Sequence, residues 1–383
     1  MEIKNLNEVC MINMGQSPDS SSYNDKKEGL AFYQGNADFG EIHPTTRVWC
    51  NNPIKIAEKD DILISVRAPI GSMNIANEKC CIGRGLASIK PIDKNECNQN
   101  YLYYFLESKV PYMQSKGTGS TFKAINKGIL TSLQIKLPNI REQEKISSII
   151  SKIKAQIHNK KLQIRKYDEL VKSQFIEMFG DPDLSQQKES WDELENVGEI
   201  VGGSTPKTSI KEYWDGDLNW FTPAEIKDND FIVNQSERKI TELGAKSCSL
   251  RKMPINTVIL SSRAPIGKVA LAGCEFYCNQ GFKNIVCNEN LNPIFLLMLL
   301  KYNNEYLNSL GRGATFKEIS KTIVSKIKIP TPPIELQNQF ADFVKHIDKL
   351  KFSETITKLK NLCYNVFNVI QSKNLGEVKN DKL

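Results

Sequence analysis

Hydrophobic residues follow a strand-like pattern in two separate regions of the chain, residues 1–139 and 181–333. Both regions contain short β-rich runs, such as Ile62–Val66 and Val258–Ser262, divided by Gly, Asn, Asp and Pro. Runs of this kind indicate strands joined by turns. We therefore expect two mixed α/β domains, each with a modest sheet and long loops.

A helical pattern follows each of these regions. No Pro or Gly occurs from Arg141 to Phe179, apolar residues recur there at steps of three and four, and Gly180 and Pro182 then predict the end of one long helix. Residues 334–373 repeat this pattern with one phase slip. An isolated helix with such a stripe would aggregate, so we expect an antiparallel coiled coil in which the two seams bury each other. The expected seam positions are Ile150, Ile153, Ile157, Ile164, Val171, Ile347, Leu350, Ile356, Leu359 and Val366.

An internal repeat relates the two halves, and one unit of about 190 residues occurs twice. Arg-Ala-Pro-Ile-Gly stands at both 67–71 and 263–267, Gly-x-Gly-x-Thr-Phe-Lys-x-Ile at 117–125 and 311–319, and Ile-x-x-Gln at 140–143 and 334–337. The predicted fold is thus α+β, with two tandem domains and two long helices in a pseudo-two-fold arrangement. The expected boundaries are 1–139 and 181–333 for the domains, 140–180 and 334–375 for the helices, and 376–383 for a tail.

Composition changes this picture only slightly. The net charge is +7, the ten cysteines are too sparse for a disulfide scaffold, and the longest strongly apolar run, Ile294–Leu300, is far shorter than a membrane span. We expect no signal peptide, no membrane partner and a cytoplasmic location. Residues 109–172 carry 14 basic and 4 acidic side chains, which suits either a nucleic-acid partner or an ordinary solvated helix face.

Catalytic patterns are missing from the sequence. Neither a Gly-x-Gly-x-x-Gly stretch after a strand nor a Walker A sequence is present, and the three histidines lie far apart in sequence from any nucleophile pattern. The Cys274-x₃-Cys278 spacing suits a metal, but its counterparts in the first copy are Glu78 and Ile82. We therefore expect no catalytic residues, no metal and no cofactor in this chain.

Basic residues around the repeated segments are the strongest candidate site. Contacts to phosphate are independent of sequence, so they suit the shared framework, whereas base contacts suit the segments that differ between the copies. The framework candidates are Arg67, Arg84, Lys116, Lys123, Arg263, Arg312 and Lys317. The base-reading candidates are Gln16, Gln34, Asn36, Arg47, Lys207, Lys211, Asn219 and Lys227. Each base-reading candidate has the alternative of an ordinary loop residue, and Arg67 and Arg263 have the alternative of binding turn carbonyls.

Together, the duplicated Arg-Ala-Pro-Ile-Gly, Thr-Phe-Lys and Ile-x-x-Gln segments, each followed by a long helix, resemble the specificity subunit of type I restriction–modification systems. The resemblance covers essentially the whole chain. The second copy departs from the first in having Gln280 where Arg84 stands, and its helix lacks the Phe-Gly-Asp-Pro ending found at 179–182.

This resemblance implies two target-recognition domains that each read half of a bipartite DNA duplex site, while the helices set the spacing of the half-sites. It also implies two methyltransferase (modification) subunits using S-adenosylmethionine and a motor-nuclease (restriction) subunit using ATP and Mg, so the chain itself would be a non-catalytic subunit acting in phage defence. Two alternatives remain at this stage: a self-sufficient methyltransferase or nuclease with a degenerate active site, and a coiled-coil scaffold that binds no DNA.

Overall fold

A computed structural model describes residues 2–119, 123–227, 230–263, 265–313 and 317–351. The described residues form two compact units, 2–161 and 162–351. The long helix α5 (Ile140–Phe179) begins in the first unit and ends in the second. Each unit is described by itself below.

The first unit contains two main sheets and a short strand pair. Strands β2-β10-β7-β8 form an antiparallel sheet, β3-β5-β4-β9-β6 form a mixed sheet in which β4 and β9 are parallel, and β1 pairs with β11. The strands are β1 (Glu2–Asn5), β2 (Cys10–Met14), β3 (Tyr23–Asn24), β4 (Leu30–Tyr33), β5 (Trp49–Cys50), β6 (Ile56–Ala57), β7 (Ile62–Ser65), β8 (Met73–Ile75), β9 (Cys80–Ile82), β10 (Leu86–Pro91) and β11 (Gln134–Leu137). The helices are α1 (Leu6–Val9), η1 (Ser20–Ser22), η2 (Asn36–Asp38), α2 (Gln99–Ser108), α3 (Val110–Ser115) and α4 (Lys127–Thr131).

The second unit repeats this plan. In its sheet β13-β20-β17-β18-β15, the first four strands occupy the places that β2, β10, β7 and β8 have in the first unit. The pair β12-β21 corresponds to β1-β11. The other sheet, β16-β14-β19, has three strands where the first unit has five, so the units differ most there. The strands are β12 (Asp192–Glu193), β13 (Gly198–Gly202), β14 (Trp214–Phe221), β15 (Ile232–Val233), β16 (Lys239–Ile240), β17 (Val258–Ser262), β18 (Ile266–Ala272), β19 (Tyr277–Cys278), β20 (Lys283–Cys287) and β21 (Lys328–Ile329). The helices are η3 (Leu184–Gln186), α6 (Leu194–Val197), η4 (Lys211–Tyr213), α7 (Glu242–Ser247), α8 (Pro293–Tyr302), α9 (Asn304–Ser309), α10 (Lys321–Ser325) and α11 (Ile334–Lys351).

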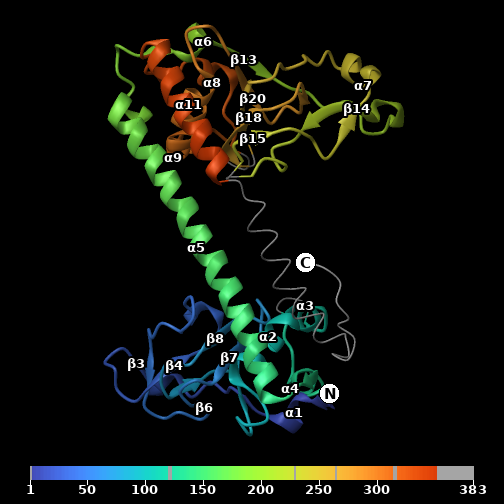
Figure 1. Ribbon diagram of the computed structural model, residues 1–383. Coiled ribbons are helices and arrows are strands. Elements are labelled where there is room, and N and C mark those ends of the chain that lie inside the picture. Colours follow the sequence, from blue (N-terminus) through green and yellow to red (C-terminus); the bar gives the residue numbers. More distant parts are fainter. Residues whose placement is uncertain (1, 120–122, 228–229, 264, 314–316, 352–383) are drawn as a thin grey trace. The chain divides into compact units, whose positions relative to one another are not determined.

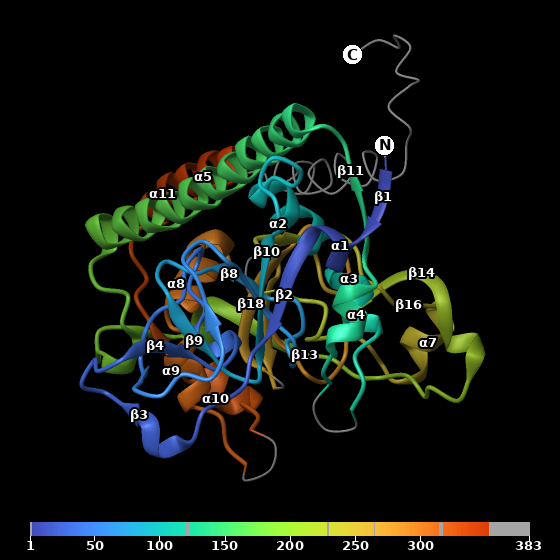
Figure 2. The same cartoon turned by 90° about the horizontal axis from the view of Figure 1, so that it is seen from below.

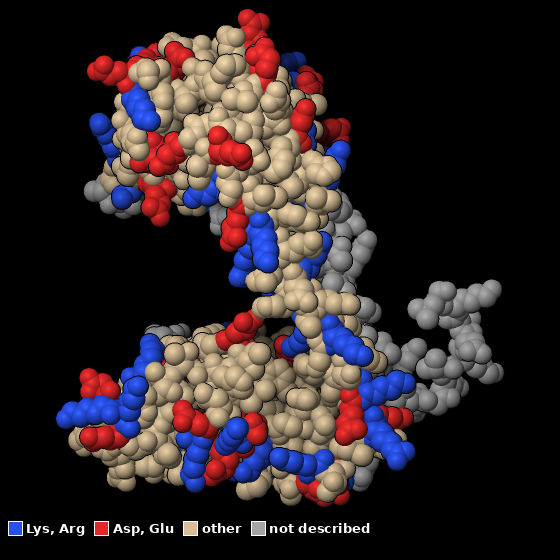
Figure 3. Space-filling model, turned by 60° about the vertical axis from the view of Figure 1, so that its left-hand side comes forward, with Lys and Arg blue, Asp and Glu red and all other residues tan. Residues whose placement is uncertain are grey.

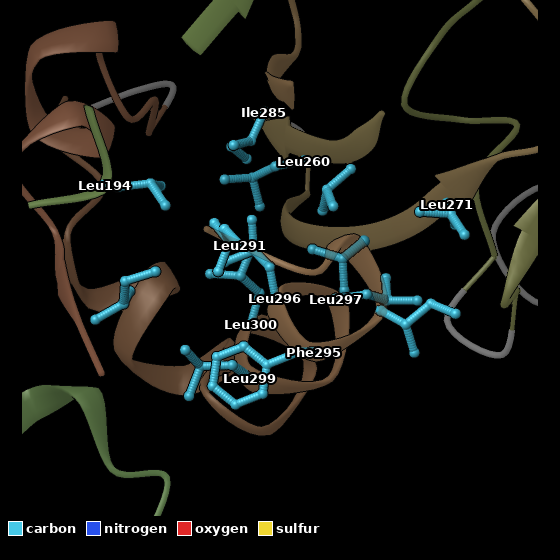
Figure 4. Close-up of a cluster of buried hydrophobic side chains, with 14 of the residues drawn as sticks. Leu194, Leu260, Leu271, Ile285, Leu291, Phe295, Leu296, Leu297, Leu299 and Leu300 are labelled. Atoms are coloured by element: carbon cyan, nitrogen blue, oxygen red, sulfur yellow. The ribbon is translucent and has the colours of Figure 1, made fainter. Parts of the chain in front are cut away.

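The largest core cluster lies in the second unit, where α8 covers the sheet (Figure 1). Leu260 of β17, Leu271 of β18 and Ile285 of β20 face the apolar side of α8 (Figure 4). Phe295 of α8 is fully buried and stacks against Phe175 of α5, with ring centroids 5.5 Å apart. The second unit is therefore built by an α/β sandwich to which the end of α5 contributes.

The start of each long helix is fixed by a buried glutamine, which explains the repeated Ile-x-x-Gln segment. Oε1 of Gln143 accepts a hydrogen bond from the backbone N of Asn98 at 2.8 Å, and its Nε2 donates to the carbonyl of Pro138. Gln337 makes the same pair of bonds with Asn292 and Pro332. Both glutamines are fully buried, so each one joins a long helix to the N-terminal cap of α2 or α8.

The helix predicted over Arg141–Phe179 is present as α5, and several of its expected seam positions also belong to the globular cores. Ile150 is buried in the core of the first unit, and Val171 and Ile347 in that of the second. Ile153 is also buried, at 8% exposure. Ile150, Val171 and Ile347 therefore contribute to the globular cores of the units. Ile157 and Ile164 are half-buried, and Leu350 is 44% exposed.

Helix α11 does lie against the C-terminal part of α5 within the second unit (Figure 2). Lys351 pairs with Asp168 at 2.5 Å, and the ring of Phe340 packs edge-on against Phe175. Since 351 faces 168 and 340 faces 175, the two helices run antiparallel there. The remaining expected seam positions, Ile356, Leu359 and Val366, lie outside the described residues, as does most of the helix expected over 334–375.

None of the helices within the described ranges is long and apolar enough to cross a membrane.

Candidate nucleic-acid interface

The two repeated basic segments come together in the first unit. The backbone of Arg67 pairs with that of Ala124, Ala68 N donates to the carbonyl of Lys123 at 3.0 Å, and Ile125 N donates to Val66 O at 2.9 Å. Residues 66–68 and 123–125 are thus neighbouring antiparallel segments, although they are far apart in sequence. Arg67 and Lys123 are both exposed, so two positive charges stand together at this surface.

The second unit builds the same arrangement. Arg263 pairs with Glu318 through the backbone, and Ile319 N donates to Ser262 O at 2.9 Å. Lys317 therefore lies beside Arg263, as Lys123 lies beside Arg67. Arg312 also pairs through its backbone with Glu318, which brings a third basic residue to the same loop.

Gly117 and Gly311 each lie close to the isoleucine of a repeated Arg-Ala-Pro-Ile-Gly turn. A Cβ on Gly117 would lie 2.6 Å from Cδ1 of Ile70, and one on Gly311 would lie 2.5 Å from Cδ1 of Ile266. Lys116 directly precedes Gly117 and is exposed at the C-terminal cap of α3. The first glycine of each Gly-x-Gly-x-Thr-Phe-Lys segment therefore favours a close contact with the isoleucine of the turn.

A third segment completes the cluster in the first unit and brings in two base-reading candidates. Gly85 O accepts a hydrogen bond from Val66 N at 2.9 Å, so the exposed Arg84 lies next to the turn. A Cβ on Gly85 would lie 2.2 Å from the carbonyl oxygen of Gln34. Gln16 N donates to Ile82 O at 3.0 Å in the same segment. Gln16, Gln34 and Arg84 thus adjoin the framework pair.

The equivalent segment of the second unit has a different polar surface. Gly281 O accepts from Ser262 N at 2.8 Å, as Gly85 does from Val66. Gln280, which replaces Arg84, accepts a hydrogen bond from Oγ1 of Thr205 at 2.7 Å. Contacts inferred for Arg84 therefore do not transfer to the second unit.

An ion-pair network also distinguishes the second unit, and it was not expected from the sequence. Glu318 lies 3.2 Å from Nζ of Lys283 and 4.0 Å from Nη1 of Arg263. The counterpart of Glu318 in the first copy is Ala124. The only available signal was this Ala-to-Glu difference between the copies. The carboxylate partly offsets the positive charge of Arg263, so the two framework clusters are not electrostatically equal.

The remaining base-reading candidates lie away from the framework clusters or are already engaged. Arg47 pairs with the buried Asp38 at 2.5 Å, which gives it a structural role. Asn36 is half-buried in η2. The amide of Asn219 donates to Sγ of Cys274 and accepts from Ser236, which argues against a base contact because both ends are occupied.

Lys207, Lys211 and Lys227 are exposed in the second unit, as a DNA contact requires, with Lys211 at the start of η4 and the other two on loops. Among the described residues, no ion pair is formed by any of these three lysines. Their positions therefore remain open to a ligand from outside the chain.

The Cys274-x₃-Cys278 spacing has a structural explanation. Burial raises the pKa of the Cys278 thiol to about 12, and Nδ2 of Asn284 donates to its sulfur at 3.1 Å. Cys278 also belongs to a hydrophobic core cluster, so its side chain is part of the packing of the second unit. Across the part of the chain that the structure describes, no group of three or more His, Cys, Asp or Glu side chains is placed to hold a metal ion.

Charge alone does not delineate the interface. On the face drawn in Figure 3, Lys and Arg side chains alternate with Asp and Glu on both units. No broad basic patch is seen among the described residues on that face, so the candidate interface is defined here by the meeting of the repeated backbone segments.

Comparison with known proteins identifies the family to which the chain belongs. The model of the type I restriction modification DNA specificity domain matches residues 1–166 and 188–362. The MjaIX specificity subunit of a type I restriction enzyme from Methanocaldococcus jannaschii is 38% identical over 186 residues, 47% of this chain and 43% of that protein. The putative MjaX specificity subunit from the same organism is 47% identical over 142 residues, 37% of this chain and 33% of that protein. The chain thus spans less than half the length of these two relatives.

Longer matches extend over most of the chain. The MjaVIII specificity subunit from M. jannaschii is 25% identical over 364 residues, 85% of this chain and 82% of that protein. A crystal structure of a type I restriction–modification S subunit from M. genitalium has a TM-score of 0.58 at 15% identity, covering 96% of this chain and 94% of that chain, which shows a shared fold. The chain therefore belongs to the type I restriction–modification DNA specificity family and carries two specificity domains in tandem.

Proposed function

We propose that this chain is the DNA-binding specificity subunit of a type I restriction–modification complex, and that each unit reads one half of a bipartite duplex site. The observation that carries the proposal is the duplicated cluster, in which Arg67 meets Lys123 and Arg263 meets Lys317. The two clusters are similar, whereas the residues around them differ between the units. This suits a DNA duplex, whose phosphate backbone is uniform while its two half-sites differ in sequence.

The roles of the two residue groups follow from this division. The framework arginines and lysines bind phosphates, which gives affinity without sequence preference. Gln16 and Gln34 adjoin the cluster of the first unit, and amide side chains can pair with adenine in the major groove. In the second unit, Lys207, Lys211 and Lys227 supply the corresponding contacts.

The chemistry of the complex belongs, in this proposal, to partner subunits. Two modification subunits supply S-adenosylmethionine-dependent adenine methylation, a restriction subunit supplies ATP- and Mg-dependent cleavage, and the complex acts in the cytoplasm on the host's and invading DNA. The long helices α5 and α11 form the antiparallel pair that fixes the half-site spacing and provides the docking framework. The family match favours this function and gives no support to a self-sufficient methyltransferase or nuclease.

Binding by the chain assembled with its modification subunits tests the proposal. A randomised duplex library is offered at increasing salt, and the bound sequences are determined. The proposal predicts enrichment of two short half-sites at a fixed spacing, with affinity that falls steeply as salt rises. Salt-insensitive binding, or capture of all sequences equally, would contradict it and favour a scaffold that reads no DNA sequence.

A further inference from the structure

An arginine outside the candidate clusters is held in an unusual position in the second unit. The guanidinium carbon of Arg238 lies 3.8 Å from the ring centroid of Trp214 and 5.7 Å from that of Trp220. The two indole rings are edge-on to each other, with centroids 5.0 Å apart. Arg238 is therefore stacked over an aromatic pair while remaining exposed.

The aromatic pair is itself fixed. Both rings are nearly buried, at 8% exposure for Trp214 and 2% for Trp220. Nε1 of Trp214 donates to the carbonyl of Lys207 at 3.3 Å, and Nε1 of Trp220 donates to that of Ser204 at 3.1 Å. A rigid support limits the orientations that the guanidinium group can take, so less conformational entropy is lost on binding.

The backbone that carries Arg238 is also held in place. Oγ of Ser236 donates to the Arg238 carbonyl at 2.5 Å, and Trp220 N donates to Oγ of the same serine at 2.9 Å. Glu237 N donates to a carboxylate oxygen of Glu225 at 2.8 Å. The turn before β16 is thus hydrogen-bonded to β14, and the backbone at Arg238 is held in place.

The donors of Arg238 have no protein partner within the described ranges. No carboxylate or carbonyl there accepts a hydrogen bond from the guanidinium group. Stacking uses the face of this planar group and leaves its N–H edge available. An arginine presented in this way suits a ligand with two coplanar acceptors.

The position of Arg238 connects it to the proposed interface. The loop that receives the two indole N–H bonds includes Thr205, which donates to Gln280 at 2.7 Å. Gln280 precedes Gly281, whose carbonyl accepts from Ser262 beside Arg263. A continuous series of contacts therefore links Arg238 to the framework cluster of the same unit.

The geometry points to Arg238 as a specificity-determining residue of the second unit, which reads a guanine in its half-site through O6 and N7. This inference rests on the proposed function and names one of its base contacts. A guanine is favoured over a phosphate because Arg238 lies in a segment with no counterpart in the first copy, whereas phosphate contacts belong to shared residues.

Substitution by lysine tests the inference, because Arg238→Lys keeps the charge and loses the planar pair of donors. The complex with modification subunits is measured against a randomised duplex library, beside Arg238→Ala. We expect preference for guanine at one position of one half-site to fall about fivefold or more in both variants, with the other positions unchanged. Arg251→Lys is the matched control, since Arg251 is an exposed arginine of the same unit that pairs with Glu199.

Other outcomes would overturn the inference. A uniform loss of affinity for all sequences in Arg238→Ala, with a salt slope reduced by about one, would make Arg238 a phosphate contact. Unchanged base preferences in a variant that keeps the wild-type unfolding temperature would show that it contacts no base. If the wild-type complex itself selects no sequence, the proposed function is wrong as well. If the wild-type complex selects a bipartite site and the Arg238 variants keep the same base preferences, only the role of Arg238 is wrong.

Discussion

At the scale of single residues, the interface depends on side chains whose neighbours come from distant parts of the sequence. Lys123 and Lys317 were identified from the repeated Thr-Phe-Lys segment, and each lies beside the arginine of the repeated turn. The sequence did not reveal that Glu318 would approach Arg263 and Lys283. That contact depends on the pairing of two loops, which the sequence pattern of either loop alone does not specify.

Removal of a framework lysine tests the phosphate contacts. We expect Lys123→Ala and Lys317→Ala to weaken binding similarly for all duplex sequences and to lower the salt slope by about one each. Lys94→Ala is the control, because Lys94 is exposed and follows the C-terminal end of β10, whereas the cluster lies at the N-terminal end of that strand. An unaltered slope in both framework variants would count against phosphate binding at this cluster.

Exchange of the acidic residue between the copies tests the electrostatic difference. Glu318→Ala removes a carboxylate near Arg263, so we expect DNA affinity to rise about fivefold at low salt, which corresponds to about 1 kcal/mol. The reverse change, Ala124→Glu, should lower affinity by a similar factor. Both effects should shrink as salt is raised in equilibrium binding measurements, since exposed charges are screened. Equal affinities for all three proteins would refute a role for Glu318.

At the scale of elements, the sequence predicted much of the fold because the repeat supplied each element twice. Strand β17 coincides with the expected run Val258–Ser262, and α5 begins at the expected residue 140 and ends one residue before the expected 180. The partners of α5 were predicted less well. Periodicity identifies an apolar stripe but not its partner, and Ile150 and Val171 proved to pack into the cores of their own units. The Arg238–Trp214 stack also escaped prediction, because it requires the bulged pairing of β14 with β16.

The buried glutamines provide a test at this scale. Gln337→Leu should lower the free energy of unfolding by about 2–4 kcal/mol, because Asn292 N and the carbonyls of Pro332 and Asn290 lose their partner. The change is measured as the shift of the urea transition assigned to the second unit. Gln339→Leu, at an exposed position of the same helix, should leave that transition within about 0.5 kcal/mol of the wild type. Similar shifts in the two variants would show that the buried bonds have no special role.

At the scale of the whole molecule, one helix is shared by both units. Residues 159–165 of α5 lie between Ile150, which is buried in the first core, and Val171, which is buried in the second. Their removal shortens the helix by about 10 Å and nearly preserves the phase of its faces. Each half-site sequence should be retained because none of the deleted residues belongs to the core of either unit.

We expect this deletion to change the spacing between half-sites by about three base pairs, given a rise of about 3.4 Å per pair. Selection from a duplex library reports spacing and sequence together. Insertion of the same seven residues is the matched variant and should change the spacing in the opposite direction. A change in the recognised bases, with the spacing unaltered, would refute the role of the helices in setting distance.

Methylation mapping tests the central claim most directly. The chain is expressed with its modification subunits in a host that lacks other adenine methylation, and genomic DNA is sequenced by a method that detects the modified base. Two tandem specificity domains predict a single bipartite, asymmetric site with two different half-sites at a fixed spacing. An undivided site, or a genome without modification although the complex assembles, would contradict the account.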